Sequence, residues 1–387
     1  MSKYNIACIA DLHFRAFPPK DLYFELQEGF IKKLDEMDKL DLIVILGDLY
    51  NAETGLNNID TVYSFKFGND IKRIALEKNA KVRLIKGTRS HDQDQLYAFA
   101  QLFQDSGVDF KLITEVQDEQ LFQDVRVLYI PEEYMEHPGQ YYHPWLKVGQ
   151  LYDFIFMHGL VDDATFVAKG QESESTHKKA PIFHTEDLLD HTIACVMSGH
   201  IHTMMNIKES FYYVGSYSCW KHGEEEDKGF YLIEYDTNTQ RYETEFVVNK
   251  NRKRFITITI DKENEIFTMD LTNAINYLLN LSKNFTYDNL RFKIFIPNEY
   301  NNTLLLTQSI KEAFSNKKNI KIEFKNNRDK IIEDQMKEKL TKVKEKYGYI
   351  FDNHLTPFDK ISKFIQERFK IEISEEEVKR ILTRSFK

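Results

Sequence analysis

The first 250 residues repeat one pattern, in which a short apolar run is followed by a polar cluster beginning with Asp, Gly or His. Continuous runs of β-branched and aromatic residues are typical of strands buried on both faces. Amphipathic segments such as Leu22–Lys39 lie between them, so the alternation predicts α/β layering. The predicted strands are Ile6–Ala10, Leu42–Leu46, Val82–Ile85, Phe154–Met157 and Ile193–Met197.

Residues 205–248 follow a different pattern. Three strand candidates, Phe211–Val214, Phe230–Tyr235 and Tyr242–Val248, are separated by turn residues instead of amphipathic segments. Short strands joined in this way predict a hairpin-rich edge.

A second unit is predicted after the basic stretch Asn251-Arg252-Lys253-Arg254. Strand and helix patterns alternate here in the order β-α-β-α-β, which indicates a small α/β domain over residues 251–328. The elements are strand Phe255–Ile260, helix Met269–Leu281, strand Leu290–Ile296, helix Thr303–Phe314 and strand Ile320–Phe324.

Residues 329–387 predict a helical tail. A charged helix over about Asp329–Lys346 ends at Tyr347-Gly348-Tyr349, and a second helix begins at Thr356-Pro357. A third begins at Ser374-Glu375-Glu376-Glu377, which has the form of a capping box. We expect three parts in total: 1–250, 251–328 and 329–387.

Composition indicates a soluble globular protein, with 42% hydrophobic and 29% charged residues in a chain of 387. No stretch approaches the roughly 18 apolar residues of a membrane span, and the N-terminus has no signal-peptide pattern. Three scattered cysteines, Cys8, Cys195 and Cys219, suit a reducing compartment. We therefore expect a cytoplasmic protein. The Asn- and Lys-rich composition suggests a low-GC bacterial host or its phage.

The net charge of −9 is unevenly distributed. Residues 251–387 hold 27 Lys+Arg and 20 Asp+Glu, a net of +7, so the first 250 residues hold 25 basic and 41 acidic residues, a net of −16. The basic C-terminal part can bind phosphates directly, whereas the acidic N-terminal part needs bound cations to do so. Charge also varies along any chain, so this asymmetry alone decides nothing.

Five polar clusters directly follow the five predicted strands. Because the carboxyl ends of strands gather at one edge in layered α/β folds, we expect these clusters to converge. Carboxylate and imidazole together favour manganese, iron or zinc. One such cluster alone is more often structural or solvated than metal-binding, but five in register favour a metal centre. The clusters are Asp11-Leu12-His13, Gly47-Asp48-Leu49-Tyr50-Asn51, Gly87-Thr88-Arg89-Ser90-His91-Asp92, His158-Gly159 and Gly199-His200-Ile201-His202.

The order of these clusters resembles that of the calcineurin-like metallophosphoesterase superfamily, whose motifs are D-x-H, G-D-x-x, G-N-H-D, a lone His and G-H-x-H. The resemblance implies a layered β-sandwich flanked by helices and two divalent ions, most simply Mn²⁺. Asp11, His13 and His202 would hold the first ion, and His158 and His200 the second. Asp48 would bridge them. His91 would serve near the scissile phosphate, oriented by Asp92.

Two features depart from the family pattern. The third cluster is two residues longer than G-N-H-D, and Ser90 stands in the place of the Asn that would bind the second ion. The resemblance leaves open whether Ser90, Thr88 or water fills that position. Asn51 stands where some nuclease members carry a second active-site His and others an acid.

A further block narrows the resemblance to SbcD-type nuclease subunits of SbcCD DNA-repair complexes. Tyr213-Val214-Gly215-Ser216 is followed by Gly223-Glu224 and Lys228-Gly229-Phe230, and Arg252–Ile260 with the next α/β unit is similar to the capping domain of that family. The similarity covers about residues 1–325. It implies a metal-dependent DNA exonuclease, with single-strand endonuclease action as a further expectation, in break repair or recombination.

The same resemblance implies partners. Basic side chains of the cap would grip DNA, and an apolar tail helix would bind an SbcC-like coiled-coil ATPase. Helices around the second motif, including Ile59–Leu76, would pair two copies of the chain. The DNA-binding candidates are Arg252, Lys253, Arg254, Lys317, Lys318 and Lys321, and the partner-binding candidates are Phe358, Ile361, Phe364, Ile365 and Phe369.

Two other readings remain open at this point. The chain can be a stand-alone small-molecule phosphodiesterase or nucleotidase, which would leave linear duplex DNA intact. It can also be a catalytically weak DNA-binding scaffold, in which case replacing His91 would change nothing.

Overall fold

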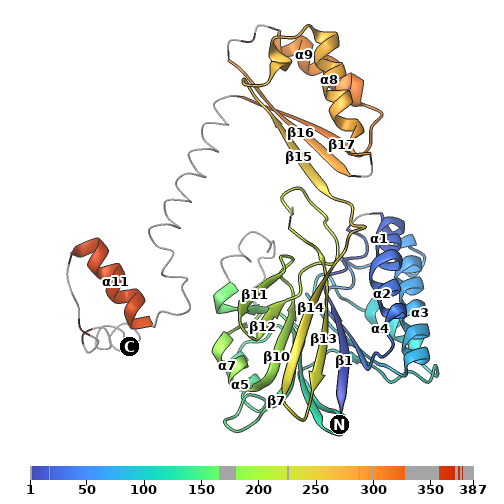
Figure 1. Ribbon diagram of the computed structural model, residues 1–387, viewed down its shortest axis with the longest axis vertical. Coiled ribbons are helices and arrows are strands. Elements are labelled where there is room, and N and C mark those ends of the chain that lie inside the picture. The colour runs from blue at the N-terminus through green and yellow to red at the C-terminus, as the bar shows by residue number, and fades with distance from the viewer. Residues whose placement is uncertain are drawn as a thin grey trace. The chain divides into compact units, whose positions relative to one another are not determined.

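A computed structural model describes residues 2–16, 18–164, 180–224, 226–286, 288–298, 300, 302–326, 357–370, 374 and 377. The chain divides into two compact units (Figure 1). The first comprises Met1–Thr257 with Phe285–Leu290, and the second comprises Ile258–Asn284 and the chain from Arg291 onward. The first unit thus extends past the expected end at residue 250.

The first sheet of unit one has the strand order β14-β13-β1-β2-β3-β4. Its last four strands run parallel, and β13 pairs antiparallel with β1 on one side and β14 on the other. The predicted strands of this sheet are confirmed. The bounds are β1 Lys3–Ile9, β2 Leu42–Leu46, β3 Lys81–Ile85, β4 Phe110–Ile113, β13 Gly229–Asp236 and β14 Arg241–Val248.

The second sheet has the order β11-β12-β10-β7-β6-β5, in which β12, β10, β7 and β6 run parallel. Three strands of this sheet were not predicted, β5, β6 and β11. The sequence of β5 is mostly polar, as suits a sheet edge. The bounds are β5 Gln117–Phe122, β6 Val125–Ile130, β7 Tyr152–His158, β10 Thr192–Gly199, β11 Met205–Lys208 and β12 Phe211–Tyr213; a small pair, β8 Leu160–Val161 and β9 Ile182–Phe183, lies apart.

The two sheets face each other across one apolar cluster. Cys8 and Val44 of the first sheet belong to the same buried group as Phe156 and Met197 of the second. Because successive side chains of a strand point to opposite faces, every second residue of the parallel strands points away from this cluster, toward the outer face of its sheet. A strand buried on both faces is therefore a continuous apolar run, which is why the sequence identified these strands so well.

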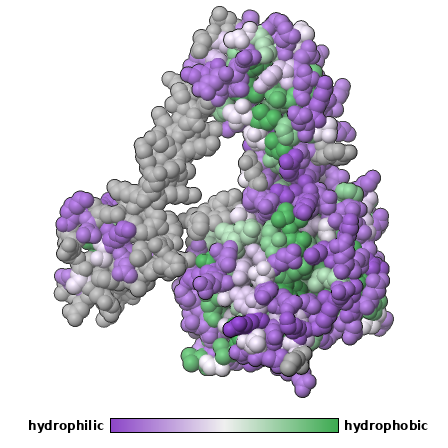
Figure 2. Space-filling model, viewed as in Figure 1, coloured by the Kyte–Doolittle hydropathy of each residue, from purple (hydrophilic) through white to green (hydrophobic). Residues whose placement is uncertain are grey.

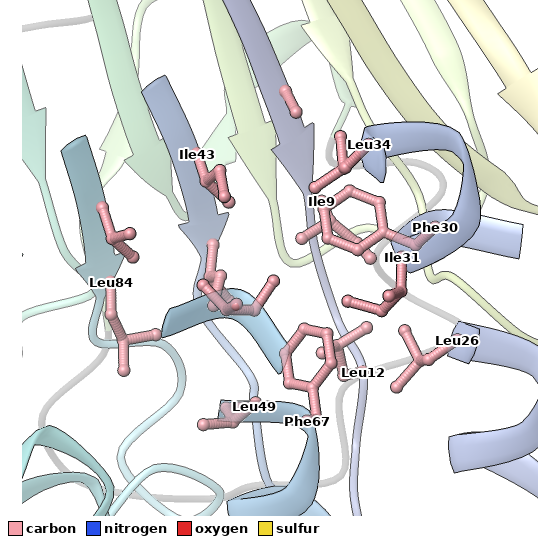
Figure 3. Packing of buried hydrophobic residues seen from close by; sticks show 14 of the residues in the cluster. Ile9, Leu12, Leu26, Phe30, Ile31, Leu34, Ile43, Leu49, Phe67 and Leu84 are labelled. Carbon is pink, nitrogen blue, oxygen red and sulfur yellow. The ribbon is translucent and has the colours of Figure 1, made fainter. Parts of the chain in front are cut away.

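Helices cover the outer face of the first sheet. Figure 3 shows Phe30 and Ile31 packed near Ile9, with Phe67 and Leu12 in the same buried group. The predicted amphipathic segment Leu22–Lys39 is helical as far as Glu36 and contains a π turn. The bounds are α1 Pro19–Leu26, the π turn η1 Gln27–Ile31, α2 Lys32–Glu36, α3 Ile59–Lys78, α4 Gln95–Ala100 and the 3₁₀ turn η2 Gln101–Phe103.

The outer face of the second sheet carries a third buried group, which includes Tyr142 of α5 (Pro138–Tyr142) and Leu188 of α7 (Thr185–Leu189), with the 3₁₀ turn η3 at Asp162–Ala164. Unit one is therefore layered, with helices outside two facing sheets. The predicted mixed α/β fold class is confirmed.

Unit two contains the predicted β-α-β-α-β order. Its strands form a sheet of order β15-β16-β17, and Asp270 caps α8 by accepting a hydrogen bond from the Asn273 backbone N–H at 2.9 Å. Leu278 and Ile310 contribute to its buried interior. The bounds are β15 Phe255–Ile260, η4 Glu265–Phe267, α8 Leu271–Lys283, β16 Asn289–Ile296, α9 Thr303–Phe314 and β17 Ile320–Asn326.

Part of the predicted tail is described. The helix expected from Thr356-Pro357 is α11, Pro357–Phe369. The capping box is confirmed, because Ser374 N–H donates to Glu377 at 3.0 Å while Glu377 N–H donates to the Ser374 hydroxyl at 3.4 Å. The expected helix at 329–346 and its break at 347–349 lie outside the described residues.

Hydrophilic residues cover most of the face shown in Figure 2. Among the described residues, no helix combines the length and apolar character that crossing a bilayer requires.

Candidate metal centre

The predicted polar clusters converge at the carboxyl ends of strands from both sheets. The first sheet delivers Asp11 and His13 after β1 and Asp48 after β2. The second sheet delivers His158 at the end of β7 and His200 after β10. The facing sheets therefore bring together side chains that lie far apart in the sequence.

Asp11, His13 and His202 form one buried group, whose possible ligand atoms all lie within 4.8 Å of one another. Both ring nitrogens of His13 are buried and make no hydrogen bond. Burial of unpaired polar atoms is costly, and a bound cation would satisfy one of them. This orphaned imidazole is what a metal site requires.

Glu132, His158 and His200 form a second group within the same 4.8 Å limit. The Glu132 carboxylate oxygen Oε2 lies 2.8 Å from His200 Nδ1 and 3.8 Å from His158 Nε2. The carbonyl oxygen of Leu46 lies 2.7 Å from His158 Nδ1, so that nitrogen donates its proton there. Nε2 is then the atom that keeps a lone pair for a metal.

Asp48 lies between the two groups. Its Oδ2 is 3.6 Å from His13 Nε2 in the first group, and its Oδ1 is 3.4 Å from His158 Nε2 in the second. A carboxylate with one oxygen toward each group is placed to bridge two cations.

The backbone is bent sharply at these ligands. Asp11, His13, Asp48 and His200 all adopt positive φ, from 49° to 86°. This left-handed region is uncommon for residues with a side chain, and such outliers cluster at functional sites. The bends turn each side chain back from its strand end toward the centre.

Gly87 allows the third loop to pass directly beside Asp48. A Cβ on Gly87 would lie 2.2 Å from Asp48 Oδ1 and 2.3 Å from the Asp48 backbone nitrogen. Because the backbone atom cannot swing away, Gly87→Ala should displace the carboxylate and weaken Mn²⁺ binding at least about tenfold, with a loss of about 1–3 kcal/mol in unfolding free energy. Calorimetric titration with Mn²⁺ and urea denaturation measure the two effects. Gly55→Ala is the matched control, since no atom lies within 4 Å of its added Cβ; equal binding by both variants would contradict this packing argument.

Burial and charge set the protonation of the histidines in opposite ways. Burial lowers the pKa of His13 to about 4, despite the nearby Asp11 and Asp48, so its ring is neutral at pH 7. Burial also opposes the charged form of His158, but the negative charge of Asp48 offsets this and raises the pKa of His158 to about 9. In the ion-free protein the proton on His158 thus supplies part of the positive charge that a bound cation would supply.

The third loop arranges His91 and Asp92 differently from the expectation. The His91 ring donates from Nδ1 to Asp48 Oδ2 at 2.8 Å. Asp92 instead accepts hydrogen bonds from the backbone N–H groups of Tyr50 and Gly87, at 3.1 and 2.9 Å. Asp48 is therefore the carboxylate that orients His91, while Asp92 holds two loops together.

Thr88, not Ser90, is the hydroxyl that faces the second group. Thr88 Oγ1 lies 3.2 Å from Asp48, 3.3 Å from Glu132 and 3.4 Å from His158 Nε2. The buried Ser90 hydroxyl makes no hydrogen bond. Asn51 donates its backbone N–H to the Phe14 carbonyl at 2.9 Å.

Sequence reasoning missed several residues at this site. Glu132 follows the unpredicted strand β6, so the signal available was a carboxylate just after an apolar run. Trp220 packs on His13 and His202, with ring centroids 3.6 and 4.2 Å apart. Lys228 was identified in the Lys228-Gly229-Phe230 block, but its role was not predicted. Its buried ammonium donates to the His202 carbonyl at 2.8 Å, which fixes the backbone of that ligand.

The basic candidates fall into two sets. Arg252 pairs with Asp227 at 2.9 Å, Lys253 with Asp21 at 3.1 Å and Arg254 with Asp288 at 2.7 Å. These three cations are already paired in unit one. Those of unit two, Lys317, Lys318 and Lys321, are exposed around the turn between α9 and β17.

The apolar candidates of the tail lie on α11. The side chains of Ile361, Phe364 and Ile365 are half-buried. Those of Phe358 and Phe369 lie outside the described side chains. The role of this helix stays a prediction.

Comparisons with known proteins name no relative. No family model matches the chain, and no curated protein matches it. Among the 27 chains of solved structures that match, one covers 64% of this chain and all of its own length, with 12% identity and a TM-score of 0.36. Similarity at that level carries no argument about family or activity.

Proposed function

We propose that the chain is a metallophosphoesterase of the SbcD type, a two-metal nuclease that hydrolyses phosphodiester bonds in DNA during break repair or recombination. The observation that carries this proposal is Asp48, a buried carboxylate with one oxygen toward each of two histidine-containing groups. The layered α/β architecture, with its polar groups at strand ends, supports it.

The residues present fit two divalent cations. Asp11, Asp48 and Glu132 place three buried carboxylates beside imidazoles, a donor set that suits manganese, iron or zinc. Two bound cations would lower the pKa of a shared water and offset charge on the phosphoryl oxygens. Our choice among these metals is Mn²⁺.

His91 is placed to donate a proton to the leaving oxygen. Burial opposes its charged form, but the hydrogen bond to Asp48 raises the pKa of His91 above its ordinary range. Nδ1 is engaged by Asp48, which leaves Nε2 for an exchangeable proton, and 29% of the side chain is exposed. An accessible imidazole with a raised pKa suits general-acid catalysis.

The assembly we propose follows the same family. Exposed lysines of unit two would contact DNA phosphates. Helix α11 would bind an SbcC-like coiled-coil ATPase, and α3 would contribute to a homodimer of the subunit. We place the protein in the bacterial cytoplasm, in keeping with its buried, unpaired cysteines.

Incubation of end-labelled linear duplex DNA with Mn²⁺ tests the activity. We expect loss of label that EDTA abolishes, and a fall of about 10²–10⁴-fold in His91→Ala, the usual contribution of a general acid. His91→Ala should still bind two Mn²⁺ ions, because the two groups around Asp48 remain.

His143→Ala is the matched control, since His143 is exposed on the turn after α5. Intact duplex with wild-type protein, alongside rapid hydrolysis of bis(p-nitrophenyl) phosphate, would instead identify a small-molecule phosphodiesterase. Binding of DNA ends without cleavage would identify a scaffold.

A further inference from the structure

Three adjacent parallel strands of the second sheet each place one possible ligand at the same edge. β6 is followed by Glu132, β7 ends at His158, and β10 is followed by His200. Because parallel neighbours end side by side, this convergence is built into the sheet. Glu132 thus lies at the same edge of the sheet as the two histidines, after the end of an adjacent strand.

The Glu132 side chain is buried and held in one orientation. Its exposed fraction is 3%, and the Tyr134 hydroxyl donates to Oε1 at 2.6 Å. The Glu132 backbone N–H donates to the Lys86 carbonyl at 3.3 Å, which ties this loop to the end of β3. With Oε1 engaged by Tyr134, Oε2 is the oxygen directed toward the centre.

The neighbours of Oε2 are the groups that a second cation would touch. They are His200 Nδ1 at 2.8 Å, Thr88 Oγ1 at 3.3 Å and His158 Nε2 at 3.8 Å. Among the described residues, both ion pairs of Glu132 are with histidines, which bind metal in their neutral form. Once His158 has released its proton to bind a metal, the buried Glu132 carboxylate faces neutral imidazoles, and the bound cation then balances its charge.

We propose that Glu132 is a direct ligand of the second metal ion, sharing it with Asp48, His158 and His200, and that Thr88 lines the same position. This inference rests on the two-metal centre of the proposed function. It moves the missing ligand from Ser90, in the third loop, to the loop that follows β6 of the other sheet. A second carboxylate at this ion also adds a hard oxygen ligand, which favours Mn²⁺ over softer metals.

Calorimetric titration of the ion-free full chain with Mn²⁺ tests the assignment. Wild type should bind two ions, and Glu132→Ala should bind one at Mn²⁺ concentrations that fill both wild-type sites. Glu132→Gln keeps an oxygen ligand without the charge, so it should retain the second ion with at least about tenfold weaker affinity. Ser90→Ala should bind two ions as wild type does.

Glu133→Gln is the matched control on the same loop. Its carboxylate faces away from the centre, accepting a hydrogen bond from the Tyr141 hydroxyl at 2.8 Å and the Val116 backbone N–H at 3.2 Å. This variant should bind two ions with wild-type affinity. Circular dichroism of each variant separates loss of a ligand from loss of the fold.

Anomalous diffraction from Mn²⁺-soaked crystals separates a ligand from a residue that only orients His200. A ligand oxygen lies about 2.2 Å from its ion. A second ion more than about 3 Å from Glu132, or two ions bound with full affinity by Glu132→Ala, would overturn the proposal. Neither readout involves DNA, so a wild-type chain that binds two ions and cuts no DNA would end the nuclease proposal and leave this ligand in place.

Discussion

Replacing Asp48 with asparagine should abolish Mn²⁺-dependent DNA cleavage, with a loss of 10³-fold or more. Loss of one electrostatic stabiliser of a transition state already costs about 10²–10³-fold, and Asp48 serves both groups of the centre through different oxygens. An amide presents one oxygen and one N–H₂ group and carries no charge. It can therefore face one group as a ligand but not both. The bound ions should fall from two to at most one, as measured by calorimetry beside the cleavage assay.

The matched control is Asp38→Asn, since Asp38 is exposed after α2. It should bind two ions and cleave DNA at the wild-type rate. Circular dichroism should show that Asp48→Asn keeps its secondary structure. An Asp48→Asn variant that still binds two ions and cleaves DNA would remove Asp48 from the bridging position.

Saturating Mn²⁺ should raise the thermal unfolding midpoint by several degrees. Binding at 1,000 times the dissociation constant stabilises a folded chain by about 4 kcal/mol for each site. The ions also remove an existing cost, because His13 keeps two buried ring nitrogens without hydrogen bonds. Differential scanning calorimetry with Mn²⁺ and with EDTA measures the shift.

The shift should shrink as the pH falls. His158, whose pKa is raised to about 9, carries a proton below that pH in the ion-free protein and must release it to bind a cation. Apparent affinity therefore falls with each pH unit below 9. Asp48→Asn should lose most of the shift at every pH, whereas an equal shift in that variant would indicate ions bound elsewhere.

The sequence predicted those parts of the fold that leave a local pattern. Leu42–Leu46 is apolar throughout because both faces of β2 are covered, and Thr303–Phe314 forms the predicted helix with the same bounds. In contrast, β5 contains Gln117, Asp118, Glu119 and Gln120, so it leaves no apolar run to recognise. This segment forms a strand because it pairs with β6 in the sheet, and its local sequence does not indicate that pairing.

The candidate site divides in the same way. Asp11, Asp48, His158 and His200 stand in recognisable motifs directly after strong strand patterns. Glu132 stands in no motif, and only the neighbouring positions of β6, β7 and β10 bring it to His200. The partners of His91 and Asp92 could not be predicted either, because the loop geometry directs the His91 ring to Asp48 and the Asp92 carboxylate to two backbone N–H groups.

Equilibrium dialysis of the ion-free chain against Mn²⁺, combined with electron paramagnetic resonance, tests the two-ion centre most directly. The arrangement around Asp48 predicts two ions per chain and the spectrum of a spin-coupled pair, because one carboxylate joins them. A single uncoupled ion, or no ion at saturating Mn²⁺, would contradict it.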